Sequence, residues 1–123
     1  MQKLIIPGYL PGYNQLTQGQ WYKQHKCKQE AMALVQWLVL AQKIQPVTGK
    51  AVIAIACYEP TIRRDPSNVR AGAEKIILDA LQNAGIIRND NWAALSDLPA
   101  TVYLDRKNPR VEVTIEEDNN ADN

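Results

Sequence analysis

The chain is organised around residues 63–91, which read RRDPSNVRAGAEKIILDALQNAGIIRNDN. A run of Asp-Pro-Ser-Asn suits the start of a helix, because Ser or Asn side chains can accept the unpaired N–H groups of the first turn. From Val69 the apolar residues recur at three- and four-residue steps, and Gly85 can take the left-handed conformation that ends a helix. The stretch therefore predicts a helix with an acidic residue at each end, Asp65 before it and Asp90 after it.

The segments on either side predict a small sheet. Residues 52–58 are almost wholly apolar, which is typical of a central strand covered on both faces. Residues 110–116 alternate apolar and polar, which predicts a strand with one buried face, paired in a hairpin with a strand over 101–105. A short strand is predicted at 2–6. Together with two main helices these elements predict an α+β domain, with a small mixed or antiparallel β-sheet on which the helices pack.

The second main helix is predicted over residues 20–43, and it combines a basic start with an apolar stripe. Lys23, His25, Lys26 and Lys28 stand near its N-terminus, where positive charge opposes the helix dipole. A phosphate backbone would favour that charge, and an ordinary solvated lysine-rich face explains the same residues. The stripe consists of Ala31, Leu34, Val35, Leu38 and Ala41, broadened by Trp37 and Leu40.

Length, charge and composition limit the classes of protein to which the chain can belong. A chain of 123 residues predicts one domain, and its net charge of +1 gives no general argument for nucleic acid. The acids at the C-terminal end leave the remainder with an excess of about five positive charges. We expect a folded domain over 1–116 and an acidic disordered tail over 117–123. No secretory signal or apolar run of about 20 residues is present, so a cytoplasmic protein without a membrane partner is expected.

Two stretches outside the central helix offer polar side chains with more than one interpretation. The loop over residues 7–14 carries Tyr9, Tyr13 and Asn14, which either contact a ligand or close the end of the core. Lys75 and Asp79 are four apart on the predicted helix, so an ordinary ion pair is the first interpretation and a role in the site is the second.

A pair of carboxylates, Asp65 and Asp90, would give the molecule a definite chemistry if the fold brought them together. Two close carboxylates repel each other unless a cation joins them. Hard oxygen ligands favour Mg²⁺ or Mn²⁺, and such an ion can activate water for attack on a phosphate. Lys75, Arg64 or Arg88 could then offset the negative charge of the phosphate.

The order of these motifs resembles the RusA family of Holliday junction resolvases, which occur in bacteria and their prophages. Residues 5–14 are similar to the family's first strand and its proline-rich loop, and residues 52–60 to the strand before its catalytic loop. Residues 63–68 resemble the signature Arg-Asp-x-Asp-Asn, residues 75–90 the following helix and acidic loop, and residues 110–116 the closing strand. The resemblance implies a homodimeric, Mg²⁺-dependent endodeoxyribonuclease, with Mn²⁺ as a substitute, that binds four-way DNA junctions and nicks two strands symmetrically.

The resemblance also assigns roles to single residues. Asp65 matches the first signature carboxylate and Asp90 the distal one, and Lys75 matches a basic catalytic residue if a short insertion near 69–72 is allowed. One residue departs from the signature, because Ser67 stands where the family has its second acid. Ser67 can offer a weak metal ligand, and Asp79 or Asn89 could supply a replacement oxygen. The expected DNA contacts are Arg63, Arg64, Asn68, Arg70, Arg88, Tyr13, Asn14, Lys23 and Lys26.

Two alternatives to an active resolvase follow from the same residues. With fewer anionic ligands at Ser67, the protein would bind junctions through a weakened or inactive metal site. In the other alternative it is a structural or partner-binding protein that uses the Tyr9 and Tyr13 loop and the first long helix. The dimer interface is not named by the sequence, and Trp37 and Leu40 are candidates for it.

Overall fold

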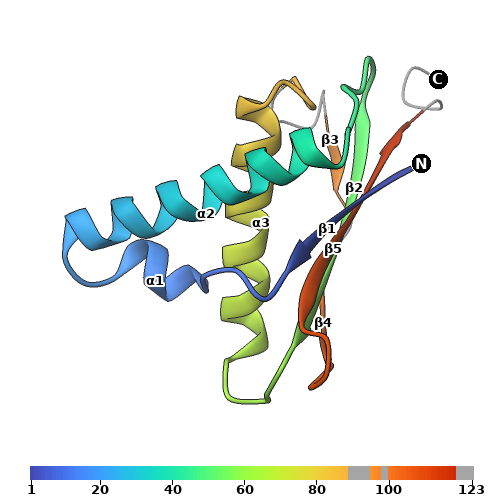
Figure 1. Ribbon diagram of the computed structural model, residues 1–123. Helices are drawn as coiled ribbons and strands as arrows, with labels where there is room; N and C mark the ends of the chain where they lie inside the picture. Colours follow the sequence, from blue (N-terminus) through green and yellow to red (C-terminus); the bar gives the residue numbers. More distant parts are fainter. Residues whose placement is uncertain (89–94, 98–99, 119–123) are drawn as a thin grey trace.

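The computed structural model describes residues 1–88, 95–97 and 100–118, and it confirms an α+β fold. A mixed sheet forms one layer, and the helices pack on one of its faces (Figure 1). Within the described residues the strands are β1 (Gln2–Pro7), β2 (Ala51–Glu59), β3 (Leu95–Asp97), β4 (Thr101–Leu104) and β5 (Arg110–Glu117).

The sheet is built around β2. On one side β2 pairs antiparallel with β5, which in turn pairs antiparallel with β1. On its other side β2 pairs parallel with β3 near its start and with β4 near its end. Every strand of the described sheet therefore contacts β2 directly or lies one strand away from it.

The predicted hairpin of residues 101–105 with 110–116 is wrong, because β4 and β5 lie on opposite sides of β2. Tyr58 shows this directly, since it is in register with Tyr103 on β4 and with Arg110 on β5. The connection between the two strands passes the end of β2, where the Asp105 N–H donates to the Glu59 carbonyl at 2.8 Å. Alternation along a strand identifies its buried face but carries no information about its neighbour.

The sheet is covered on one face only, so the prediction that β2 is covered on both faces is also wrong. Alternate residues of β2, from Ala51 to Glu59, are buried, and those between them are partly exposed. On β5 the predicted inward residues Val111, Val113 and Ile115 are buried, as expected. The outward residues of β2 are mostly small and apolar, which is why its sequence looks buried on both sides.

Three helices, α1 (Tyr13–Thr17), α2 (Trp21–Ala41) and α3 (Pro66–Asn83), pack against one another and, through α2 and α3, against the sheet. The predicted face of α3 is confirmed for Ile76, Ile77, Ala80 and Leu81, which are fully buried. Gly85 has φ +76° just past the end of α3, as expected for a helix-terminating glycine. The short helix α1 was not predicted; it occupies the end of the Pro- and Gly-rich loop.

The buried face of α2 is rotated from the predicted stripe. Ala31, Val35 and Leu38 are buried as expected, but Leu34, Trp37 and Leu40 are exposed, Leu40 by 78%. Met32 and Val39 take their places in the core. The second half of α2 is apolar on two faces, so periodicity alone does not choose between them. No helix in the described residues is long and apolar enough to cross a membrane.

The end of the folded region extends past the predicted boundary at residue 116. Glu117 belongs to β5, where its carboxylate accepts hydrogen bonds from the Thr48 hydroxyl at 2.6 Å and the Gly49 N–H at 2.7 Å. The Asp118 N–H donates to the Lys50 carbonyl at 2.6 Å, and residues 119–123 lie outside the described residues.

Candidate active site

Asp65 lies at the junction of the loop after β2 with the first turn of α3, and its side chain is exposed. It is the N-cap residue of the helix, and its Oδ1 accepts the Ser67 N–H at 3.2 Å. The cap is thus Asp65 and not Ser67 or Asn68, with Pro66 as the first helical residue. Along the described stretches of the chain, no lysine or arginine forms an ion pair with Asp65.

Asp90 and Asn89 lie outside the described residues, so the meeting of Asp65 with Asp90 stays a prediction. The predicted helix between them is present and runs unbroken from Pro66 to Asn83, about 27 Å along its axis. Arg88, the last residue described before them, is exposed.

Arg64 is occupied by contacts within the protein. Its Nε donates to Glu59 Oε1 at 2.7 Å and its Nη2 to Glu59 Oε2 at 3.0 Å, which is a bidentate pair. Its Nη1 donates to the Leu10 carbonyl at 2.9 Å, and its guanidinium lies 4.9 Å from the centre of the Tyr9 ring. Arg63, the preceding residue, is exposed to solvent.

The loop before α1 packs closely on the first two turns of α3. The Asn14 N–H donates to Asn68 Oδ1 at 2.7 Å. A side chain at Gly72 would collide with the Pro11 carbonyl, and its Cβ would lie 2.8 Å from the Gly12 Cα. This contact places Tyr13 and Asn14 beside Asn68, so residues far apart in the sequence share one surface.

The tyrosines of this loop do not close the core. Leu10 does so with 4% exposure, whereas Tyr9 is 58% exposed and Tyr13 44% exposed. Both rings are therefore available to a ligand on the same side of the molecule as the start of α3.

Ser67 and Arg70 lie one turn apart on α3. The Arg70 Nη2 donates to Ser67 Oγ at 3.4 Å, and Ser67 itself is exposed. The position of the missing signature acid is thus filled by a neutral hydroxyl with a guanidinium beside it.

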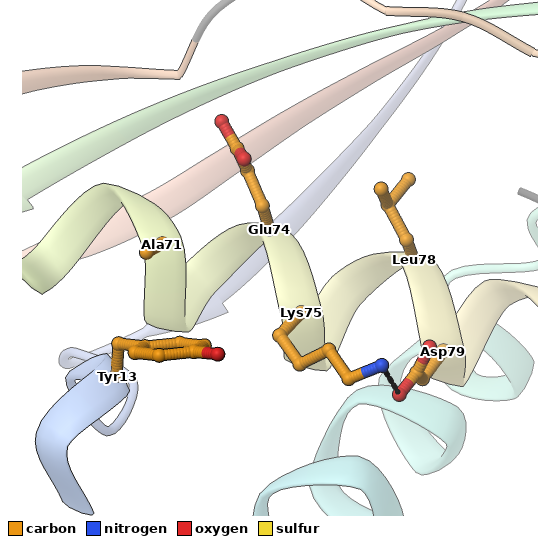
Figure 2. Close-up of a pocket in the computed structure, with 6 residues that line it drawn as sticks. All are labelled: Tyr13, Ala71, Glu74, Lys75, Leu78 and Asp79. Atoms are coloured by element: carbon orange, nitrogen blue, oxygen red, sulfur yellow. Dashed lines mark ion pairs between the residues drawn. The ribbon is translucent and has the colours of Figure 1, made fainter. Parts of the chain in front are cut away.

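Lys75 and Asp79 form the ion pair that their spacing predicted, at 3.2 Å, as Figure 2 shows. Lys28 of α2 approaches the same Oδ2 atom of Asp79 to 2.9 Å. Burial opposes ionisation of Asp79, but hydrogen bonds from Lys28 and Lys75 outweigh it and hold the pKa of the carboxyl below its usual range. Asp79 is therefore committed to two ammonium groups and is a poor candidate for a metal ligand.

Lys75 is also distant from Asp65. Helix α3 is unbroken from Pro66, so the ten residue steps from Asp65 to Lys75 correspond to about 15 Å along the helix axis. Its ammonium group points towards Asp79, farther along the helix, and Tyr13 lies beside its stem in a shallow pocket (Figure 2). The structure brings Asp65 together with Ser67, Asn68 and Arg70 but does not bring it together with Lys75.

Lys23 and Lys26 are exposed in the first turns of α2. Lys26 makes one loose ion pair with Glu30, at 3.9 Å between exposed side chains. Such a pair is worth less than about 1 kcal/mol, so both lysines remain available to an anionic partner.

The donor chemistry of Asp65 suits a hard cation such as Mg²⁺. Its carboxylate is exposed, retains unshared oxygen lone pairs and has no described cationic partner. In the part of the chain that the structure describes, His, Cys, Asp and Glu side chains form no cluster of three or more. A site at Asp65 therefore needs a further ligand, and Asp90 is the one that the sequence predicts.

Sequence reasoning missed Glu59, the one charged side chain that is buried among the described residues, with 5% exposure. A signal for it existed, since an acidic residue ends an otherwise apolar strand five residues before an arginine. Nothing in the sequence indicated that the same arginine also donates to the Leu10 carbonyl.

A comparison with protein-family models matches residues 11–116 to a family described as endodeoxyribonuclease RusA. The match covers most of the chain and includes Asp65, Ser67, Asn68 and Arg70. No curated protein matches the chain.

Proposed function

The chain belongs to the RusA family of endodeoxyribonucleases that act on Holliday junctions, and from that premise we propose that it resolves four-way DNA junctions by paired, symmetric, Mg²⁺-dependent nicks. The observation that carries the proposal beyond the family is the exposed Asp65 carboxylate at the start of α3. It stands beside exposed basic and aromatic side chains and has no described cationic partner.

Asp65 is the proposed metal ligand of the described chain, and Asp90 is its proposed partner. The bound ion would activate a water molecule and offset charge on the scissile phosphate. Ser67 can add a neutral oxygen. Asp79 forms ion pairs with Lys28 and Lys75, which argues against Asp79 as the metal ligand that replaces the missing acid at residue 67.

Basic and polar side chains around Asp65 are the proposed contacts to DNA. Arg63 and Arg70 stand on either side of it in sequence and supply positive charge for the phosphates near the cut. Tyr13 and Asn14 continue the same surface. Lys23, Lys26 and Arg88 are proposed as further DNA contacts, and Arg88 lies past the end of α3 opposite to Asp65. Lys75 is proposed to act on the DNA outside the immediate environment of Asp65.

A nicking assay on a mobile four-way junction tests this function. Wild-type protein with Mg²⁺ should produce paired nicks in opposite strands, with Mn²⁺ as a substitute and no cutting in EDTA. Asp65→Asn and Asp90→Asn should each lose about 100-fold or more of the cleavage rate. Glu116→Gln, at an exposed carboxylate on β5, is the matched control and should cut normally.

A linear duplex of the same sequence separates structure-specific cutting from general nuclease activity. Equal cutting of duplex and junction, or equal rates for wild type and Asp65→Asn, would contradict the proposed function.

The hydroxyl at Ser67 favours a second candidate, a junction-binding protein with a weakened metal site. Under this alternative, Ser67→Asp should raise the cleavage rate sharply at constant junction affinity, because a second carboxylate strengthens Mg²⁺ binding. An unchanged cleavage rate in Ser67→Asp would show that the missing carboxylate at residue 67 does not limit cleavage.

A homodimer is the proposed assembly, because two opposed strands must be cut together. The exposed apolar side chains of α2 that include Trp37 and Leu40 are the proposed contact. An enzyme that acts on junctions in chromosomal or prophage DNA is proposed to work in the cytoplasm.

A further inference from the structure

Helix α1 is short and begins at a residue that cannot cap it. It spans Tyr13–Thr17 and buries none of its side chains completely. An isolated helix of this length is unstable in water, so contacts with the rest of the protein hold it. Gln15 Oε1 accepts the Gly12 N–H at 3.0 Å, which is one half of the reciprocal bonding found at many helix starts. The other half needs a side-chain oxygen on the N-cap residue, and the N-cap residue here is Gly12.

Asn68 of α3 supplies the missing cap from another part of the chain. Its Oδ1 accepts the N–H of Asn14, the second residue of α1, at 2.7 Å. A Ser, Asp or Asn at the N-cap position of a helix normally accepts this bond. The two residues are 54 apart in sequence, so the bond that completes the start of α1 also joins it to the first turn of α3.

Gly12 is matched to this bond by space and not by backbone conformation. Its φ of −74° and ψ of 163° are accessible to any residue. An added Cβ would collide with Asn68 Nδ2 and would lie 2.9 Å from Asn68 Cγ. A residue with a capping side chain of its own would therefore displace the amide that caps α1.

Asn68 connects this loop to the proposed metal ligand. Asp65 caps α3 by accepting the Ser67 N–H, and Asn68 follows Ser67 in the same turn. Tyr13 and Asn14, at the start of α1, are exposed, and both are proposed contacts to DNA. One turn of α3 therefore carries the Asp65 carboxylate and the hydrogen bond that holds Tyr13 and Asn14.

We propose that Asn68 is a positioning residue, whose side-chain oxygen caps α1 and thereby holds Tyr13 and Asn14 in place for DNA beside Asp65. This inference rests on the proposed nuclease function. The role requires an acceptor oxygen at residue 68 and requires no contact between Asn68 and DNA. Direct contact of the Asn68 amide with DNA is the competing explanation for a loss of binding, and suitable variants separate the two.

Junction binding and cleavage should respond differently to Asn68→Ala. The junction Kd, measured in EDTA, should rise by about 5- to 100-fold, as expected for the loss of an aromatic contact with a base. The single-turnover cleavage rate at saturating junction should fall by less than about threefold, because Asp65 keeps its own bond to the Ser67 N–H. Tyr13→Ala should raise the Kd by a similar factor, and it should add less than about twofold in the Asn68→Ala background, because both changes remove one contact.

Asn83→Ala is the matched control, because Asn83 is an exposed asparagine at the other end of the same helix. It should leave the junction Kd and the cleavage rate within about twofold of wild type.

Amide hydrogen exchange, followed by NMR without DNA, tests the cap directly. In Asn68→Ala the Asn14 N–H loses its acceptor, and the Gln18 N–H, which bonds to the Asn14 carbonyl, loses protection as α1 frays. Both amides should exchange faster than in wild type. Asn68→Asp keeps an acceptor oxygen but not the NH₂ donor, so it should keep wild-type exchange at both amides. The amides of the β1–β5 pair should not change in either variant.

Gly12→Ser separates the folding of α1 from its position. Alone, it should weaken junction binding, because the new Cβ displaces the Asn68 amide. In the Asn68→Ala background that collision is removed, and the serine hydroxyl can cap α1 locally. The double variant should recover wild-type exchange at Asn14 and Gln18 but not the junction affinity, because α1 is no longer bonded to α3.

Three results would overturn the proposal. One is wild-type exchange of the Asn14 amide in Asn68→Ala. A second is losses of affinity in Asn68→Ala and Tyr13→Ala that multiply in the double variant, which would show that Asn68 contacts DNA by itself. A third is wild-type affinity in the combined Gly12→Ser and Asn68→Ala variant, which would show that α1 needs a cap but not the bond to α3.

The exchange measurement keeps this inference distinct from the function on which it rests. A wild-type protein that neither binds nor cuts junctions removes the nuclease proposal, and exchange at Asn14 then decides whether Asn68 is the cap. If Asn68→Ala does not fold, Asn68→Ser keeps a hydroxyl whose oxygen lies one bond nearer the backbone than Oδ1. Wild-type exchange and affinity in Asn68→Ser would overturn the proposal.

Discussion

Asp79 shows how its neighbours decide what a carboxylate can do. Two lysines from two helices share one oxygen of Asp79 and keep the pKa of the group low in spite of partial burial. Asp65, on the same helix, has no such partner in the described chain and stays available. The residue type is the same at both positions, and the surrounding charges separate a structural acid from a candidate ligand.

The low pKa of Asp79 makes a prediction about pH. A depressed pKa in the folded state contributes stability above the unfolded value of about 4, and that contribution is lost as the pH falls through the folded value. Asp79→Asn should therefore lower the free energy of unfolding by about 1 kcal/mol at pH 7, and by less at pH 3. Urea unfolding of both proteins at the two pH values measures this, and an equal difference at both would contradict it.

The two cysteines should differ in reactivity. Burial, followed by the charge of Glu59, raises the pKa of the Cys57 thiol to about 11, and the side chain is 1% exposed. Partial burial and Glu30 raise the pKa of Cys27 as well, but Cys27 is reachable from solvent. Iodoacetamide at pH 8 should modify Cys27 in the native protein and both thiols in urea. Mass spectrometry identifies the modified cysteines, and equal labelling of Cys27 and Cys57 in the native protein would contradict the prediction.

At the scale of elements, local patterns predicted what each segment is but not where it goes. Helix α3 and strand β5 were predictable because one face of each is buried and the other is wet, which imposes a period on the sequence. The sequence did not allow us to predict that β4 and β5 pair with β2, or how α2 is rotated about its axis. The apolar residues of β2 and α2 occupy both parities or two faces, so several packings satisfy the same pattern.

The same division applies to the candidate site. The position of Asp65 at a helix start follows from Asp-Pro-Ser-Asn, since local turn chemistry determines it. The hydrogen bond from Arg64 to the Leu10 carbonyl joins residues 54 apart in sequence, and it depends on tertiary packing. Signature motifs indicated that Arg64 matters, but only the fold shows that three of its N–H donors bind acceptors within the protein.

The packing of the first loop on α3 makes a prediction at Gly72. Glycine inside a helix costs about 1 kcal/mol relative to alanine, so Gly72→Ala would stabilise an isolated helix. Here the added Cβ collides with the Pro11 carbonyl, so the variant should lose about 1–3 kcal/mol of stability and should cut junctions more slowly.

Thermal and urea unfolding measure the effect of Gly72→Ala. Gln82→Ala, at an exposed position of the same helix, is the control and should be neutral or slightly stabilising. A stabilised Gly72→Ala variant would show that the loop can move away from the helix without cost.

At the scale of the whole molecule, α2 presents an apolar surface that nothing in the described chain covers. Leu34, Trp37 and Leu40 are 43%, 64% and 78% exposed. Patches of this kind on otherwise compact proteins mark contacts with other molecules, which fits the proposed second copy of the chain.

Substitution of this surface tests the dimer. Trp37→Glu and Leu40→Glu should reduce the mass measured by light scattering from that of a dimer to that of a monomer, and junction cutting should then stop at single nicks. Ile62→Glu, at an exposed apolar residue outside α2, should keep the dimer mass. A monomeric wild type would contradict the homodimer, and dimeric variants would place its interface elsewhere.

The order of strands in the sheet also governs how the protein is made. β1 pairs with β5, and β2 pairs with β3, β4 and β5, so the two strands of residues 1–88 have no pairing with each other. A nascent chain leaving the ribosome therefore exposes the apolar run of β2 until residues 95–117 have emerged. Late closure of this kind slows folding and favours aggregation during synthesis, and β5, the strand that joins β1 to β2, completes the sheet.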